Sequence, residues 1–353
     1  MNRRNFPALI TVLVAINCGW LSASLGNAGE GLAPYPSFAE AEAEVRDLAQ
    51  THPEQVQLFI AGKSAGGHDL LLLRIQKGDG IARPAALIAG GIHGDEFIGN
   101  RTAMAAAAIL LASDDPLASQ VLQRMDVYVL PLINPDGYAA AWECEGKGPA
   151  KQTRTNHNGV DLNRNFGKPK ARLDLPLGYS GSRDPASTRY IGPSPVSEPE
   201  AQAVRDLAQK YRFFAAVDFH SSGGMIIPVL DDDPRSHLGL GKMAAAYRKA
   251  QADRYLIVMF PWWLPIYQGS MEECLYREAG TLAVLIELGK AKDFERGRNV
   301  SEFWGFNPRE PETIARIAKD NARAAFAALL AAFEYTGGKT ELRPGRELAG
   351  IFP

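Results

Sequence analysis

Short apolar runs of strand length alternate with helical segments along most of this chain. Four strongly apolar runs have the length of buried strands, at residues 85–89, 127–133, 213–220 and 281–289. Segments with helical spacing separate or flank them, at residues 37–51, 99–113, 197–211 and 312–335. Such alternation is typical of a largely parallel sheet covered by helices on both faces. We therefore expect an α/β fold, with one domain built on a mixed, largely parallel, twisted sheet.

Local signals complete this outline. Two further strands are predicted at residues 56–60 and 69–75, joined by a glycine-rich turn. The sequence NPDG at residues 134–137 predicts a turn. Residues 139–194 lack clear periodicity, and so long a stretch inside a compact domain usually carries function. The helix at residues 197–211 opens with Ser197 as N-cap and Glu200 in the position that closes a capping box.

The first 28 residues have the layout of a secretory signal. Arg3 and Arg4 precede an apolar stretch at residues 7–20, which is too short to span a bilayer. The opening NRRNF also resembles a twin-arginine export signal. We therefore expect a secreted or periplasmic protein with no membrane span once residues 1–28 are removed. Residues 336–353 are expected to form a loosely ordered tail.

Composition excludes some classes of function. The chain is 46% hydrophobic and 22% charged, and its formal net charge is −2, so nothing predicts a basic face for nucleic acid. Beyond the signal only Cys144 and Cys274 remain, and no Cys-x-x-Cys motif occurs. Two thiols so far apart in sequence more often stay free than pair. Any zinc site must therefore use histidine and carboxylate ligands.

Side chains suited to metal binding lie at or just beyond strand ends. His93 and Glu96 follow the strand at residues 85–89, and His220 ends the strand at residues 213–220. A His-x-x-Glu pair arises often by chance in surface loops, and a lone strand-end histidine can be an ordinary core residue. In parallel sheets, however, ligands bind outside the carboxyl ends of the strands, where these residues would meet. The pattern therefore predicts a metal site.

Two histidines and a glutamate form one known ligand set of catalytic zinc, with a fourth position left open for water. We predict one zinc per chain, bound by His93, Glu96 and His220. The other histidines lie beside a proline, in a glycine-rich turn, in a polar loop and in a helical segment. We expect none of these to bind the metal: His52, His68, His157 and His237.

A metal-bound water needs a base that takes its proton and passes it to the leaving nitrogen. Glu287 suits this role because it follows the apolar residues 282–286, where burial would raise its pKa. The alternative is a strand-end glutamate that faces solvent.

The loop at residues 153–166 concentrates arginine, asparagine and aspartate. Arginine binds carboxylates bidentately, and an arginine beside a metal can stabilise an oxyanion. An aspartate can orient a zinc-binding imidazole through its second nitrogen. By composition alone the segment could also be an exposed basic loop. The candidate residues are Arg154, Asp161, Asn163 and Arg164.

The chain resembles the zinc metallocarboxypeptidase family typified by carboxypeptidase A. The resemblance covers roughly residues 35–335, which would then form the catalytic domain. It is carried, in the family's order, by GKSAGGHDLLLLRI, GGIHGDE, INPDG, RTNHNGVDLNRNF, SEPEAQ, DFHSS and LIELG. HGDE is weak alone, but the whole set is highly specific.

The resemblance implies a role for each matching position. His93, Glu96 and His220 would hold zinc, Glu287 would be the catalytic base, and Asp161 would support His93.

The substrate would be held by other matching residues. Arg154 would polarise the scissile carbonyl, while Asn163 and Arg164 would bind the terminal carboxylate. IYQG resembles the segment with the family's mobile tyrosine, which suggests Tyr267, although its spacing to the base is shorter than usual. An ungapped count back from the base puts Glu272 at the family's specificity-pocket position, and the alternative is that Glu272 points to solvent.

Three functions are compatible with these observations. The first is a zinc carboxypeptidase that takes peptides with a free C-terminal carboxylate. The second is a zinc amidase similar to murein tripeptide amidase, which takes cell-wall peptides near diaminopimelate. The third is a peptide-binding protein that has lost catalysis, but this would predict a missing ligand or base, and none is missing.

Overall fold

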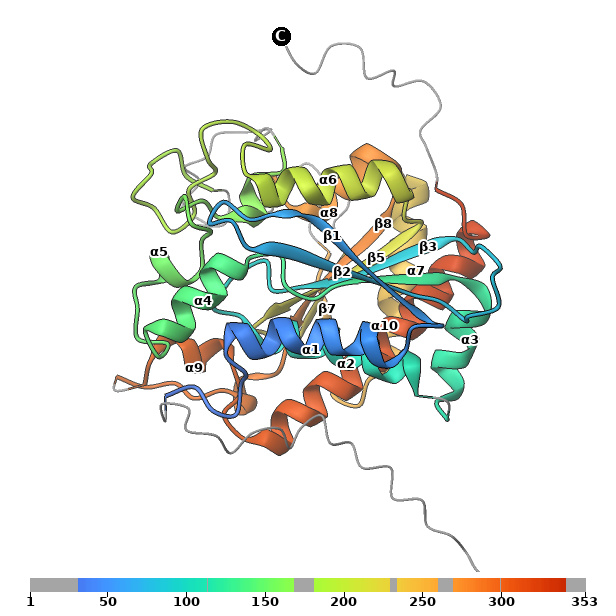
Figure 1. Ribbon diagram of the computed structural model, residues 1–353, viewed down its shortest axis with the longest axis horizontal. Helices are drawn as coiled ribbons and strands as arrows, with labels where there is room; N and C mark the ends of the chain where they lie inside the picture. The colour runs from blue at the N-terminus through green and yellow to red at the C-terminus, as the bar shows by residue number, and fades with distance from the viewer. Residues whose placement is uncertain are drawn as a thin grey trace, which may run out of the picture.

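The computed structural model describes residues 31–112, 114–167, 181–228, 234–259, 269–298 and 300–340. Within these residues the strands form one sheet of eight, in the order β1-β2-β4-β3-β5-β8-β6-β7 (Figure 1). Their bounds are β1 Val56–Lys63, β2 Asp69–Ile75, β3 Ala85–Gly90, β4 Asp126–Leu130, β5 Ala215–Ser221, β6 Met225–Pro228, β7 Leu256–Ile257 and β8 Leu282–Leu288. The predicted mixed, largely parallel α/β sheet is confirmed.

The centre of the sheet is parallel. Strands β4, β3, β5 and β8 are neighbours that run in one direction. At one side β2 pairs antiparallel with β4 and with β1, and at the other side β6 pairs antiparallel with β8 and parallel with β7. The carboxyl ends of the four central strands therefore lie along one edge. This edge is where a parallel sheet can assemble a site from segments that are distant in sequence.

Helices cover both faces of the sheet (Figure 1). In the figure α6 and α8 lie above the sheet, and α1, α2 and α10 lie below it. The helix bounds are α1 Phe38–Thr51, α2 Phe97–Leu111, α3 Pro116–Arg124, α4 Pro135–Glu143, α5 Ala150–Thr153, α6 Pro199–Tyr211, α7 Pro234–Ala250, α8 Met271–Ala279, α9 Glu302–Phe306 and α10 Pro311–Thr336.

The apolar core forms two layers because side chains alternate across each strand. On β3, Ala86 and Ile88 pack into the layer that contains α2 and α10, while Leu87 and Ala89 pack into the layer that contains α6 and α8. Both sides of the central strands are therefore buried, as the continuous apolar runs predicted.

Several local predictions were wrong. NPDG does not form a simple turn but begins α4, because Asn134 caps the helix by accepting from the Gly137 amide and Pro135 occupies the first turn. Ser197 does not cap α6: the N-cap residue is Glu198, to which Ser197 donates a hydrogen bond. Strand β4 ends at Leu130 rather than at residue 133.

The predicted signal at residues 1–28 lies outside the described residues, as does most of the predicted tail, from residue 341 onward. Within the described part of the chain, no helix has the length and apolar character needed to cross a bilayer.

Candidate metal centre

Backbone contacts fix the loop that carries His93 and Glu96. A Cβ on Gly94 would lie 2.2 Å from the carbonyl carbon of Gly137, so only glycine allows this approach. The Gly94 amide donates to the Arg154 carbonyl at 3.2 Å. The HGDE loop, the start of α4 and the loop with Arg154 are thereby held together.

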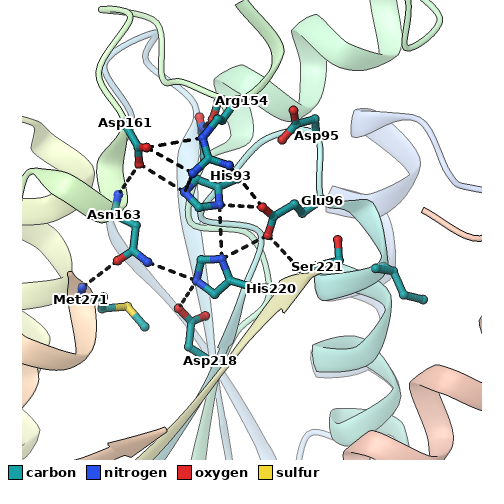
Figure 2. Close-up of polar contacts among 12 residues, drawn as sticks. His93, Asp95, Glu96, Arg154, Asp161, Asn163, Asp218, His220, Ser221 and Met271 are labelled. Atoms are coloured by element: carbon teal, nitrogen blue, oxygen red, sulfur yellow. Dashed lines mark hydrogen bonds and ion pairs between the residues drawn. The ribbon is translucent and has the colours of Figure 1, made fainter. Parts of the chain in front are cut away.

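The donor atoms of His93, Glu96 and His220 converge at the carboxyl ends of β3 and β5 (Figure 2). Glu96 lies between the two rings: its Oε1 is 2.7 Å from His93 Nδ1 and its Oε2 is 3.1 Å from His220 Nδ1. The two Nδ1 atoms are 3.2 Å apart. All three side chains are buried, so a metal ion there would be shielded from most solvent.

This arrangement fits zinc. One donor atom from each of the three residues lies within 4.8 Å of the others, and the set is two imidazoles and one carboxylate. The Glu96 carboxylate is further fixed by the Ser221 amide, which donates to Oε2 at 3.0 Å. Although burial alone would raise the pKa of Glu96, the two histidines hold it below its ordinary value. The carboxylate is therefore ready to bind a cation.

The second nitrogen of each imidazole faces an aspartate (Figure 2). His93 Nε2 lies 3.2 Å from Asp161 Oδ1, and His220 Nε2 lies 3.0 Å from Asp218 Oδ2. Both aspartates are fully buried. Asp218 was not predicted from the sequence, although its position two residues before His220 on β5 places both side chains on one face.

Arg154 lies against the predicted ligands and is held by carboxylates. Its Nη2 donates to Asp161 Oδ2 at 3.2 Å, and its Nη1 approaches Glu96 Oε1 at 3.4 Å. Burial alone would lower the pKa of Arg154, but Asp161 and Glu96 raise it. Arg154 is thus a fixed positive charge beside the cluster, with its side chain 19% exposed.

Glu287 is the register partner of His220 on the adjacent parallel strand β8. It is half-buried, so the alternative of a glutamate that faces solvent does not hold. Burial and the nearby Glu96 carboxylate raise the pKa of Glu287 to about 7. A carboxyl group with such a pKa can both accept and release a proton near neutrality.

Asn163 and Arg164 are buried beside the cluster rather than in an exposed basic loop. Asn163 Oδ1 accepts from the Met271 amide at 2.8 Å, which leaves its Nδ2 3.3 Å from His220 Nε2. Arg164 Nη1 donates to the Asn163 carbonyl at 2.7 Å. The start of α8 therefore positions the loop that carries both residues.

Glu272, in the first turn of α8, is 1% exposed, so it does not point to solvent. It forms a second group of possible metal ligands with Asp218 and His220. Within the described part of the chain, neither of its carboxylate oxygens has a hydrogen-bond partner. Burial and the neighbouring Asp218 raise the pKa of Glu272 to about 7.

Tyr267 lies outside the described residues. His52, His68, His157 and His237 take part in no possible metal-binding group within the described residues. Cys144 and Cys274 are free thiols.

The sequence profile of the zinc carboxypeptidase family matches residues 41–324. The chain belongs to this family. Membership confirms the family resemblance and the prediction of a zinc cofactor.

Curated relatives include carboxypeptidase A6 of Mus musculus, which is 30% identical over 200 residues, covering 55% of this chain and 44% of that protein. Carboxypeptidase D of Anas platyrhynchos is 24% identical over 302 residues, covering 77% of this chain and 20% of that protein. The chain thus spans less than half the length of these relatives.

Solved structures with the same fold include carboxypeptidase A from Helicoverpa armigera, with a TM-score of 0.68 and 24% identity over 84% of this chain and 73% of that chain. Thrombin activatable fibrinolysis inhibitor gives a TM-score of 0.70 at 22% identity, over 85% of this chain and 75% of that one.

Proposed function

We propose that this protein is an exported zinc metallocarboxypeptidase that hydrolyses the C-terminal amide bond of peptides. The observation that carries the proposal is the convergence of His93, Glu96 and His220 at the sheet edge, with Glu287 beside His220 on β8. Family membership supports the reaction class. Export is proposed from residues 1–28 alone.

In this proposal His93, Glu96 and His220 hold the zinc ion. Zinc, when bound, supplies a Lewis acid that polarises the scissile carbonyl and makes water more acidic. Glu287 takes the proton from the attacking water and delivers it to the leaving nitrogen. Its raised pKa supports both steps, because a stronger base takes a proton more readily and its acid remains able to donate at neutral pH.

Arg154 is proposed to stabilise the negative charge that develops on the carbonyl oxygen. Its ion pairs with Asp161 and Glu96 hold the guanidinium in place, so little reorganisation is needed during the reaction. Asp161 would also fix the ring of His93 through Nε2.

Asn163 and Arg164 are proposed to bind the substrate's terminal carboxylate, and Tyr267 to close over the substrate. Arg164 is well suited because a buried guanidinium offers two parallel donors to a carboxylate. Glu272 is proposed to face the side chain of the released residue.

One experiment tests the proposal and separates it from cell-wall amidase activity. The zinc-loaded protein is incubated with a library of peptides that vary at the C-terminus and, separately, with purified murein tripeptide. Mass spectrometry then identifies the products. Loss of single C-terminal residues from peptides supports the carboxypeptidase. Cleavage of murein tripeptide alone points to the amidase, and cleavage of neither points to a binding protein.

A further inference from the structure

Asp218 contacts the predicted zinc ligand His220 at Nε2, on the side of the ring that faces away from Glu96 (Figure 2). The two residues are two positions apart on β5, so both side chains leave the same face of the sheet. Asp218 Oδ2 is 3.0 Å from His220 Nε2, and Asp218 is 1% exposed. A buried carboxylate at this distance makes a short, charge-assisted hydrogen bond to an imidazole N–H.

The neighbours of the ring leave Asp218 as the acceptor for this N–H. Asn163 Nδ2 is also near His220 Nε2, at 3.3 Å. Asn163 Oδ1, however, already accepts from the Met271 amide, so the amide group of Asn163 presents its donor side to the ring. Among the described contacts of Nε2, Asp218 is therefore the one that can accept a proton. Nδ1 must offer its lone pair to bind a metal ion, so in the metal-binding tautomer the proton lies on Nε2 and is donated to Asp218.

The contact has a partial counterpart across the centre. Asp161 Oδ1 lies near Nε2 of His93 as Asp218 Oδ2 lies near Nε2 of His220, and Glu96 contacts both rings. Nε2 of His93 also lies 2.9 Å from Arg154 Nη2. A carboxylate that accepts from an imidazole N–H makes the imidazole a stronger electron donor through its other nitrogen.

We infer that Asp218 is a positioning residue for the zinc centre, which fixes the ring and the tautomer of His220 and strengthens its Nδ1 as a ligand. The inference rests on the proposed ligand set. It concerns the binding of zinc by the free protein, so it can be measured without any substrate.

The experiment compares Asp218→Asn and Asp218→Ala with wild type. Zinc affinity is measured by chelator competition, the absorption spectrum of the cobalt-substituted protein reports ligand geometry, and the melting temperature of the zinc-free protein reports folding. We expect Asp218→Ala to bind zinc about 10- to 100-fold more weakly, with a changed cobalt spectrum. Asp218→Asn, which keeps an acceptor but loses the charge, should be intermediate.

One carboxylate variant serves as a matched control. Asp126→Asn neutralises a buried strand aspartate at the opposite end of the parallel strands, where it pairs with Arg74. It should bind zinc within about twofold of wild type, because Asp126 contacts none of the proposed ligands.

The possible outcomes distinguish a wrong role for Asp218 from a wrong set of zinc ligands. If His220→Ala keeps zinc at full occupancy, the ligand set itself is wrong. If His220→Ala loses zinc but both Asp218 variants bind it as wild type does, with unchanged cobalt spectra, only the role of Asp218 is overturned. Should Asp218→Ala fail to fold, the isosteric Asp218→Asn decides alone.

Discussion

His220 on β5 and Glu287 on β8 are register partners in adjacent parallel strands. Register partners in a sheet point to the same face, so an imidazole and a carboxylate stand side by side at the sheet edge. The backbone of two buried strands thus fixes the spacing between a proposed ligand and the proposed base. The position of the proposed base is therefore set by the sheet and not by a loop.

Glu287→Gln should keep the zinc and the fold but lose most turnover. The amide has nearly the same shape but cannot accept the proton of water, and general-base contributions amount to about 10²–10⁴-fold. The measurements are kcat on a peptide substrate, zinc content and melting temperature. Normal kcat in this variant would show that another group is the base.

Arg164→Ala should remove the preference for a free C-terminal carboxylate. Wild type is expected to cleave a free acid at least roughly 10²-fold better than the matched C-terminal amide, because the amide lacks the negative charge that would pair with the buried guanidinium. In the variant, both substrates should be cleaved with nearly equal, low efficiency. The ratio of the two kcat/KM values is the measurement, since it is insensitive to general loss of active protein.

Arg183→Ala is the control for this prediction, because Arg183 is exposed and lies two residues after Gly181, where a Cβ would come within 3.6 Å of Arg164 Cδ. It should keep the wild-type ratio. Equal cleavage of acid and amide by the wild type would instead identify an endopeptidase.

Glu200→Gln should make the stability of the protein less dependent on pH. Glu200 is fully buried, and burial raises its pKa to about 7 from an ordinary 4.5. A raised pKa in the folded state gives its full stabilisation below the ordinary pKa, and this contribution is lost as the pH rises through the folded-state pKa. The neutral amide does not titrate, so the variant should lose about 1–3 kcal/mol less stability than wild type between about pH 5 and about pH 8.5.

Denaturant unfolding of the zinc-loaded proteins at about pH 5 and about pH 8.5 tests this difference. Glutamine keeps only one of the two acceptor atoms, since Glu200 Oε1 accepts from the Ala65 amide and Oε2 accepts from Asn156 Nδ2. The measured quantity is therefore the change in stability between the two pH values and not the stability at one pH. Glu54→Gln, at an exposed position, should show the same change as wild type. A change in Glu200→Gln as large as that of wild type would contradict the prediction.

Strand-end positions explain why much of this site could be predicted from sequence. His93, Glu96 and His220 follow or end long apolar runs, and a parallel sheet brings the ends of such runs together. The strands predicted at residues 69–75 and 281–289 match or nearly match the observed β2 and β8, because continuous burial leaves a strong apolar signal.

Other features depend on tertiary contacts that no local pattern reveals. Glu200 fits a capping box by spacing, but its carboxyl group is turned toward the Ala65 amide, 135 residues away in sequence. Helix α8 was not predicted, although Ser270 caps it, because its short sequence has two adjacent glutamates and no long apolar repeat. The Asp218 contact required the observed orientation of the His220 ring.

Glu272 should determine which C-terminal residue the protein prefers to release. Glu272 is buried, and among the described residues neither its two carboxylate oxygens nor the neighbouring Asp218 Oδ1 has a hydrogen-bond partner. A lone buried carboxylate is unfavourable without a partner, and a substrate ammonium or guanidinium would supply one. We therefore expect a preference for C-terminal Lys, Arg or the amino end of diaminopimelate over Phe or Leu.

The size of this preference follows from the burial of the pair. Truncating one member of a buried charge pair at an interface changes the binding free energy by about 2–5 kcal/mol, which sets the scale for Lys over Leu. The measurement is kcat/KM for peptides ending in Lys and in Leu, with wild type and Glu272→Gln. The variant should lose most of the preference for Lys.

Glu273→Gln is the matched control, because Glu273 is half-buried and accepts from the Gly269 amide instead. A wild-type preference for Leu that persists in Glu272→Gln would remove Glu272 from substrate binding.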